Sequence, residues 1–282
     1  MNDLHSFTAG NYTAKSAFDL ALYDIAAKHA SQPLYKFLGG TKKVIESDLT
    51  IGIDTPENMA AKAVEFVKNG VNIIKVKLGK QPEDDVERIK QIRKAIGHET
   101  KLRIDANQGW SYEDAVYVLE TLNAFDIDFC EQPMRTWNDG LLPQLCGVSP
   151  IPIMADESVF THYDAERIIR DKAAEYINIK FAKSGGIHEA TEITKVAKQH
   201  NMSCMLGGML ESRVALTAKV HFAMAHDNII FYDLDTCLLG HKEDPVIGGV
   251  TYKGMELQLT DAPGIGVDVA ETYLQQLEKA II

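Results

Sequence analysis

From residue 46 onward, short apolar runs alternate with charged stretches that have helical periodicity. The apolar runs predict strands at 48–53, 72–79, 101–107, 127–132, 151–156, 176–182, 202–208 and 229–235. The stretches between them predict helices at 57–69, 83–96, 112–123, 163–171, 187–199 and 212–225. Strands that alternate with single helices form parallel sheets. Eight such strands favour a closed TIM-type α/β barrel, although the period alone leaves an open sheet as an alternative.

Two flanking segments do not follow this alternation. Residues 14–39 have apolar residues at helical spacing and end in Gly39-Gly40, which predicts a helix stop. Residues 245–282 begin with a glycine- and proline-rich stretch and end in a predicted short helix. We therefore predict a barrel at 46–240, flanked by parts of a small accessory domain at 1–45 and 241–282.

The charge balance and the cysteines narrow the class of protein. The chain has 29 basic and 40 acidic residues and a net charge of −11, which disfavours nucleic acid and anionic membranes as partners. The four cysteines form no CxxC pair, so we interpret them as reduced thiols of a cytoplasmic protein. The sequence shows neither a secretory leader nor an apolar run of membrane-spanning length.

Charged residues stand at the ends of consecutive predicted strands, where barrels carry their chemistry. The second strand ends with Lys75 and Lys77, which the period of two places on the same inward face. The next three strands end with Asp105, Glu131 and Asp156. Three adjacent carboxylates repel one another unless a hard cation neutralises them. The sequence therefore predicts a Mg²⁺ site formed by these three acids.

The sixth predicted strand contains Lys180, and in an eight-stranded barrel this strand lies opposite the second. Lys77 and Lys180 are therefore predicted to face each other across a bound substrate. This arrangement suits removal of a proton α to a carboxylate, with cations stabilising the enediolate. A base must be a neutral amine, which nearby Mg²⁺ and the second ammonium of Lys75 favour. Proton removal on one side and return on the other inverts the carbon, so we predict racemisation or epimerisation.

Over about residues 46–240 these motifs resemble the muconate-lactonizing subgroup of the enolase superfamily. The matching pieces are the KxK of Lys75 and Lys77, the segments IDANQ, EQP and ADES, and Lys180 with its following KSGGI. The resemblance implies a (β/α)7β barrel with Mg²⁺ held by Asp105, Glu131 and Asp156. It also implies a lysine base that works through an enediolate.

The last predicted strand ends with Asp233 and Asp235, two acids on one face. Within the subgroup this DxD resembles the dipeptide epimerases, which implies that it holds the α-ammonium of the substrate. The resemblance also implies substrate contacts at Thr50, Lys75, Gly208 and Leu210, with glycine allowing close approach. We interpret Glu211 and Arg213, near the same mouth, as a structural ion pair.

The expected function is epimerisation of an L,L-dipeptide to the L,D form at its second residue. Members of this family begin with a complete α+β capping domain, whereas residues 1–45 resemble only its last helices. Residues 241–282 resemble the segment that returns to this domain. Because closure of a site often governs rate, we expect low activity from this chain alone. Surface that a cap would cover favours a homo-oligomer.

Three alternatives remain at this stage. A cycloisomerase or an o-succinylbenzoate synthase-like lyase shares the lysines and the metal but gives the DxD no cationic group to hold. A non-catalytic barrel would keep the metal site and act as a binding module. A barrel without any site requires six aligned strand-end residues to be accidental.

Overall fold

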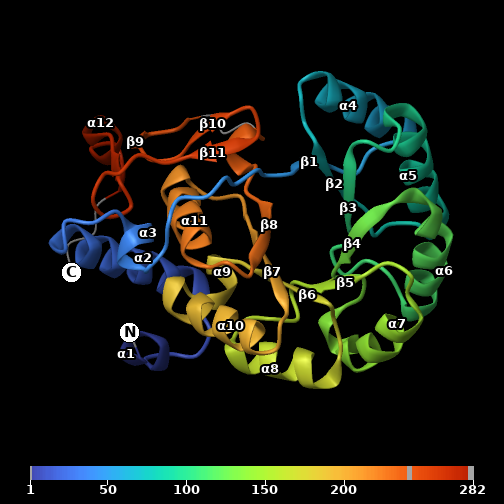
Figure 1. Ribbon diagram of the computed structural model, residues 1–282, viewed down its shortest axis with the longest axis horizontal. Helices are drawn as coiled ribbons and strands as arrows, with labels where there is room; N and C mark the ends of the chain where they lie inside the picture. Colours follow the sequence, from blue (N-terminus) through green and yellow to red (C-terminus); the bar gives the residue numbers. More distant parts are fainter. Residues whose placement is uncertain (1, 240–242, 279–282) are drawn as a thin grey trace.

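The computed structural model describes residues 2–239 and 243–278. Its largest sheet has eight strands that pair in chain order, and all seven pairings are parallel (Figure 1). The strands are β1 (Leu49–Ile51), β2 (Ile73–Lys77), β3 (Lys101–Asp105), β4 (Ile127–Glu131), β5 (Ile153–Ala155), β6 (Tyr176–Ile179), β7 (Ser203–Gly207) and β8 (Ile229–Asp233). Each of the eight predicted strands is therefore confirmed, although the strands are shorter than predicted.

The first and last strands meet and close the sheet into a barrel. The backbone N–H of Asp48 donates to the carbonyl of Tyr232 at 3.1 Å. The N–H of Leu234 donates to Ser47 Oγ at 2.8 Å. The TIM-type barrel is thus confirmed, and the open sheet is excluded.

Helices surround the strands, and in Figure 1 α4 to α7 follow the outside of β2 to β5. The helices between strands are α4 (Pro56–Lys68), α5 (Pro82–Ile96), α6 (Tyr112–Leu122), α7 (Leu142–Val148), α8 (His162–Asp171), α9 (Phe181–Ser184), α10 (Ile187–Gln199) and α11 (Arg213–Ala225). Short 3₁₀ segments are η1 (Asn123–Phe125), η2 (Thr136–Leu141) and η3 (Thr236–Leu238). Only η3 follows β8 directly, as expected for a (β/α)7β barrel.

Local sequence signals explain where several helices begin. Ser111 and Asp114 form a capping box at the start of α6, and Thr161 and Asp164 form another at α8. Proline occupies the first turn of α4 and α5, where its missing N–H costs nothing. The alternation predicts a helix between the fourth and fifth strands without giving its range, and α7, a seven-residue helix that contains Pro143, occupies this gap.

Apolar side chains fill the barrel one layer below its mouth. Phe129, Met154 and Met205 are fully buried and pack with Tyr176 and Phe231. Phe129, Met154, Met205 and Phe231 each precede a residue at the end of their strand by two positions. They therefore point into the barrel like that residue, but lie one layer further from the mouth. This layer is a packed floor that supports the polar residues at the strand ends.

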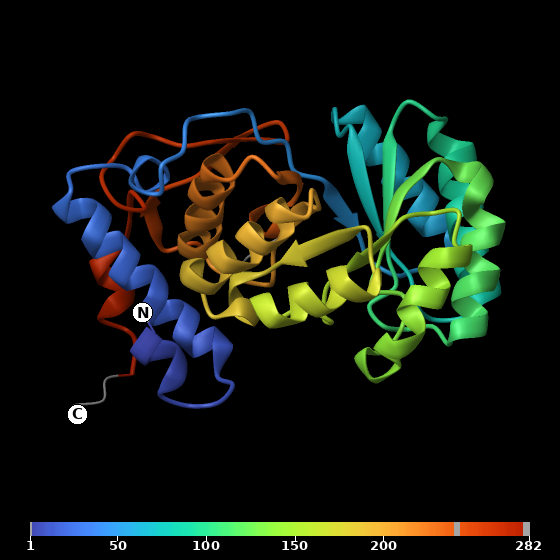
Figure 2. The ribbon, with the colours of Figure 1, turned by 60° about the horizontal axis from the view of Figure 1, so that its bottom comes forward.

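The segments outside the barrel lie together on one side, with α2 (blue) next to the C-terminal segment (red) in Figure 2. The N-terminal segment has α1 (Asn2–Ser6), α2 (Tyr12–His29) and α3 (Leu34–Phe37). The C-terminal segment has β9 (Val246–Gly248), β10 (Thr251–Lys253), β11 (Glu256–Gln258), β12 (Val267–Val269) and α12 (Glu271–Leu274). Leu34 N donates to Gly264 O at 2.8 Å and Gly264 N donates to Gln32 O at 2.9 Å, which links the two segments.

Asp19 on α2 fixes this helix to the barrel. It accepts a hydrogen bond from Ile187 N, at the start of α10, at 2.6 Å. Gly186 has a positive φ of 118°, and a Cβ there would lie 2.3 Å from Asp19 Oδ1. Glycine is therefore required for α2 to approach α10 this closely.

The predicted boundaries between the barrel and the two flanking segments, at residues 45 and 240, stay predictions. Residue 240 lies outside the described residues. Within 2–239 and 243–278, no helix is both long and apolar enough to cross a bilayer.

Candidate active site

A cavity of about 450 Å³ opens at the C-terminal ends of the barrel strands. Most of the residues predicted for the site line it, namely Thr50, Lys77, Asp156, Lys180, Gly208, Leu210, Asp233 and Asp235. Lys75, Asp105 and Glu131 are not among the lining residues, and their side chains are buried next to it. The folded chain thus brings together side chains from strand ends that are far apart in the sequence.

Lys75 lies at the centre of the acidic residues. Its side chain is 1% exposed, and its Nζ lies 2.6 Å from Glu131 Oε2, 3.1 Å from Asp105 Oδ2 and 2.8 Å from Asp233 Oδ2. Burial opposes its charge, but the surrounding carboxylates outweigh burial and raise the pKa of Lys75 well above its usual value. Lys75 therefore neutralises buried acids here, and its predicted contact with substrate stays a prediction.

Lys77 shares the inward face with Lys75, as the period of two predicts. Lys77 Nζ donates to Asp105 Oδ2 at 2.6 Å and to Asn107 Oδ1 at 2.9 Å. The Lys77 side chain is 28% exposed, in contrast to Lys75. It is therefore the lysine of this strand that a molecule in the cavity can reach.

Lys180 follows β6, which lies four places from β2 in the eight-stranded order. Its Nζ donates to Asp156 Oδ2 at 2.8 Å and lies 3.8 Å from Glu131 Oε1. Burial disfavours the ammonium form, but Asp156 and Glu131 outweigh burial and raise the pKa of Lys180. Lys77 and Lys180 thus line one cavity from opposite sides of the barrel.

The three predicted metal ligands differ in their electrostatic environment. Burial, followed by the charge of Asp105, raises the pKa of Glu131 to about 7. Burial also acts on Asp105 and Asp156, but neighbouring lysines outweigh it and lower the pKa of both carboxyl groups. Close packing of like charges thus makes full ionisation of the three acids unfavourable without more positive charge.

Two oxygens of this group are suited to a cation. Glu131 Oε2 and Asp156 Oδ1 are buried, and each already faces a cation, Lys75 Nζ at 2.6 Å and Lys183 Nζ at 2.5 Å. An all-oxygen set of three carboxylates matches the ligands that Mg²⁺ prefers, so the residues fit this ion.

Sequence reasoning did not assign the residues that support these acids. Asn178 Nδ2 donates to Glu131 Oε1 at 2.7 Å, and Lys183 Nζ lies 2.5 Å from Asp156 Oδ1. Gln132 Oε1 accepts from Asp156 N at 2.9 Å, which ties the end of β4 to that of β5. Asn178 stands two residues before Lys180, so the period of two would have placed it on the inward face.

Asp233 and Asp235 lie close together and have different pKa values. Burial opposes ionisation of Asp233, but Lys75 and Lys180 outweigh it and lower its pKa to about 2. Burial and the charge of Asp233 raise the pKa of Asp235 to about 6. Asp235 Oδ2 accepts from Thr50 N at 2.8 Å, which joins β1 to the DxD.

A third acid, Asp48, completes a second acidic group that the sequence did not predict. One carboxylate oxygen from each of Asp48, Asp233 and Asp235 lies within 4.8 Å of the others. Among the described residues, these three acids are the one set of potential metal ligands whose oxygens approach one another this closely. Arg103 Nη1 donates to Asp48 Oδ2 at 2.8 Å, whereas Asp48 Oδ1 accepts no hydrogen bond. The barrel mouth thus offers two candidate positions for positive charge.

The expected ion pair between Glu211 and Arg213 was wrong. Glu211 pairs with Lys219, and Arg213 pairs with Asp244 at 2.6 Å. Glu211 lies in the turn before α11 and Arg213 is the first residue of that helix, and each side chain finds a partner elsewhere, in α11 and in the segment before β9.

Comparison with known families agrees with this geometry. Residues 58–273 match the family described as enolase C-terminal domain-like. Residues 1–39 match the family described as mandelate racemase / muconate lactonizing enzyme, N-terminal domain. The first match spans most of the chain, so the chain belongs to the enolase superfamily. The resemblance drawn from the sequence motifs is thereby confirmed.

Several similar relatives are dipeptide epimerases. The chain is 46% identical over 275 residues to a D-Ala-D/L-Ala epimerase of Cytophaga hutchinsonii, a match that covers 97% of this chain and 74% of the relative. It is 43% identical to an L-Ala-D/L-Glu epimerase of Clostridium acetobutylicum, covering 94% of this chain and 74% of the relative. A crystal structure of the dipeptide epimerase from Cytophaga hutchinsonii, complexed with Mg and the dipeptide D-Ala-L-Val, matches with a TM-score of 0.94 and 46% identity. That match covers 97% of this chain and 74% of the crystallised chain.

Proposed function

We propose that the chain is a Mg²⁺-dependent epimerase that inverts the α-carbon of the second residue of a dipeptide. The observation that carries this proposal is the placement of Lys77 and Lys180 on opposite sides of one cavity. The cavity also contains Asp156 and the pair Asp233 and Asp235. It therefore combines two proton-transfer groups, part of a candidate metal site and a candidate ammonium site.

The two lysines would move the proton. Lys180 is held as an ammonium by Asp156 and Glu131, so in this state it can return a proton but not remove one. When Lys180 returns the proton, Lys77, the more exposed lysine, removes the α-proton from the opposite face of the substrate carbon. In the reverse direction the roles exchange. General acid–base catalysis of this kind contributes about 10²–10⁴-fold to a rate.

Asp105, Glu131 and Asp156 would hold the Mg²⁺ ion. When bound, Mg²⁺ supplies positive charge that stabilises the enediolate form of the substrate carboxylate and offsets the repulsion among the three acids. Asn178 and Gln132 orient this group through Glu131 Oε1 and the backbone N–H of Asp156. Such supporting contacts commonly change metal affinity by about 10–100-fold.

Asp233 and Asp235 would hold the free α-ammonium of the dipeptide. Charge-assisted hydrogen bonds to carboxylates are strong and directional, and these two acids lie beside the lysines in the same cavity. The substrates of a cycloisomerase or of an o-succinylbenzoate synthase carry no such ammonium. The pair of acids therefore favours the dipeptide over these alternatives.

The proposal is tested by isotope exchange. The purified chain is incubated with Mg²⁺ and a library of L,L-dipeptides in D₂O, and α-deuterium is followed by NMR and mass spectrometry. We expect exchange together with formation of the L,D product for at least one dipeptide. Mg²⁺ binding without exchange of any dipeptide would instead identify a non-catalytic binding module.

Replacement of Lys180 separates the two proton transfers. In Lys180→Ala we expect epimerisation to fall by about 10²–10⁴-fold, because only one face keeps a proton-transfer group. Lys77 can still remove and return a proton on its own face, so one diastereomer should exchange its α-hydrogen without inversion. Lys195→Ala, which removes an exposed lysine of α10 paired with Glu192, is the matched control. Full epimerisation by Lys180→Ala would refute the two-lysine mechanism.

We also infer a cytoplasmic location and a homo-oligomer. All four cysteines are free thiols, and Cys130 and Cys204 are buried, which suits a reducing compartment. Light scattering on the purified chain tests the oligomeric state.

A further inference from the structure

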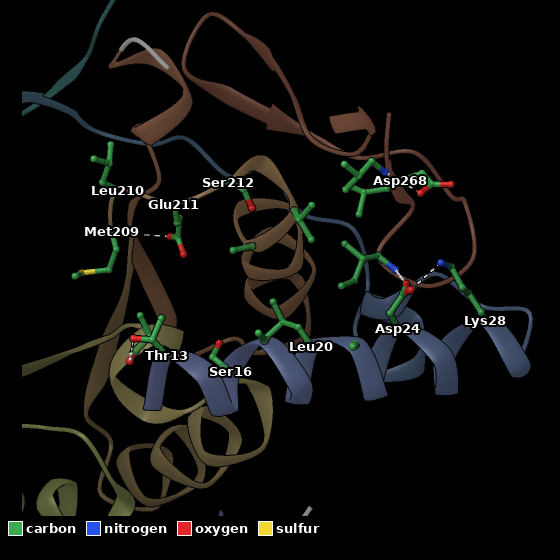
Figure 3. A pocket seen from close by; sticks show the side chains of 18 residues that line it. Thr13, Ser16, Leu20, Asp24, Lys28, Met209, Leu210, Glu211, Ser212 and Asp268 are labelled. Atoms are coloured by element: carbon green, nitrogen blue, oxygen red, sulfur yellow. Dashed lines mark hydrogen bonds and ion pairs between the residues drawn. The ribbon is translucent and has the colours of Figure 1, made fainter. Parts of the chain in front are cut away.

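The end of β7 and the turn that follows it, residues 207–211, separate two cavities. On one side Gly208, Met209 and Leu210 line the active-site cavity. On the other side Met209, Leu210 and Glu211 line a second cavity of about 600 Å³, whose far wall includes one face of α2 (Figure 3). Leu210 is 87% exposed, so the turn lacks a packed apolar anchor at this position. Polar contacts reach the turn from two sides instead.

One set of contacts comes from the end of β8. Gly208 N donates to the carbonyl of Asp233 at 2.6 Å, and Thr236 Oγ1 donates to the carbonyl of Met209 at 2.8 Å. A Cβ on Gly208 would lie 2.9 Å from Thr236 Oγ1 and 3.1 Å from Asp233 O. The turn is thus held in direct contact with the DxD segment.

The opposite set of contacts comes from Lys219 on α11. This lysine is fully buried, and its Nζ donates to the carbonyl of Gly207 at 2.8 Å. Its Nζ also donates to Glu211 Oε1. The same carboxylate oxygen accepts from Met209 N at 3.2 Å, and Figure 3 shows Glu211 directed toward this backbone group. A single ion pair therefore ties both ends and the middle of the turn together.

A buried lysine at this position is costly in itself. Burial lowers the pKa of Lys219, and the charge of Glu211 opposes that effect. A buried ion pair is weak evidence for stability, because apolar residues of similar volume often stabilise a protein as well or better. The contacts of Lys219 and Glu211 are, however, directed at backbone atoms of the turn, which an apolar pair would leave unpaired.

We propose that Lys219 and Glu211 are positioning residues that hold the turn against the DxD and so set the affinity for the dipeptide. The inference rests on the proposed function. Neither side chain reacts with substrate. Their effect is transmitted through the backbone of Gly208 and Met209, which faces the cavity beside Asp233.

Variants of the full chain are compared by steady-state kinetics in the presence of Mg²⁺. The substrate is L-Ala-L-Ala or, if the wild-type chain turns over L-Ala-L-Ala slowly, the best dipeptide from the exchange library. In Lys219→Met/Glu211→Leu both charges are removed, so that neither is left buried and unpaired. We expect KM to rise about tenfold, the effect of one or two lost hydrogen bonds, with kcat changed less than about threefold. Amide hydrogen exchange of residues 207–211 should accelerate.

A conservative variant and a surface control accompany the double variant. Glu211→Gln keeps an oxygen that can accept from Met209 N and from Lys219, so its KM should rise less than that of the double variant, although the loss of the counter-charge of Lys219 should lower its melting temperature. Lys198→Met removes an exposed lysine that pairs with Asp227, and its KM should be unchanged.

The possible outcomes distinguish the two proposals. A double variant with a lower melting temperature but unchanged KM would show a purely structural role and overturn the inference. Unchanged hydrogen exchange of the turn would do the same. A wild-type chain that exchanges no dipeptide refutes the proposed function and, with it, this inference.

Discussion

The barrel mouth contains two groups of three acids that differ in origin and in their partners. The first group, from three consecutive strand ends, is Asp105, Glu131 and Asp156. The second group, from the junction of β8 and β1, is Asp48, Asp233 and Asp235. Lys75 lies between the groups and contacts both. The first group is also contacted by Lys77, Lys180 and Lys183. The second group is contacted by Arg103.

This difference in partners suits the two groups to different cations. The first group is a set of three buried carboxylates from consecutive strand ends, which fits a small hard ion. In the second group Asp235 contacts Thr50 N, and both acids of the DxD line the cavity. An ammonium of a bound substrate could reach these two acids from the cavity. We therefore propose metal for the first group and substrate ammonium for the second.

Removal of one predicted metal ligand should give the largest effect. In Asp156→Asn one of three charged ligands is lost, so we expect Mg²⁺ binding to weaken by at least about 100-fold and kcat/KM to fall by about 10³-fold. Asp235→Asn should leave Mg²⁺ affinity within about threefold of wild type. Isothermal titration of both variants with MgCl₂ measures this contrast.

The opposite pattern would reverse the assignment of the two groups. If Asp235→Asn lost Mg²⁺ while Asp156→Asn kept it, the ion would belong to the group that contains Asp48. Circular dichroism of both variants verifies that they are folded, because Asp156 also balances the charge of the buried Lys183.

The first group could be predicted from the sequence, because the alternation of apolar runs and helical stretches shows where each strand ends. Each predicted ligand occupies the last residue of a strand or the position after it, where the period of two fixes its direction. The role of Asp48 could not be predicted, because its partner Arg103 is 55 residues away and meets it only when the barrel closes. Lys219 lies in a helix whose central residues are mostly buried, and nothing in its own segment reveals that it pairs with Glu211. Sequence patterns thus predict which way a side chain points from its own strand or helix. They do not predict which residue of another strand or helix it will contact.

The second group should control the affinity for the cationic end of the substrate. In Asp235→Asn we expect KM for a dipeptide to rise about 10–100-fold, the usual effect of losing a hydrogen bond to a charged group. The same variant should show a much smaller change with an N-acetylated dipeptide, which lacks the ammonium. Steady-state kinetics with both substrates measures the difference. An equal loss for both would mean that Asp235 does not bind the ammonium.

The smallest expected effect is a pH dependence that distinguishes the two acids of the DxD. Burial, with the charge of Asp233, raises the pKa of Asp235 to about 6, so Asp235 is ionised above this pH and protonated below it. The carboxylate is the form that attracts an ammonium, and kcat/KM should therefore fall as the pH decreases through about 6. Only about a tenth of the carboxylate remains one pH unit lower, which gives about a tenfold loss at pH 5. The acid side of the pH profile of wild type and Asp235→Asn is the measurement. If the variant keeps the same acid limb, another group of the barrel mouth controls it, and the assignment of the ammonium to Asp235 fails.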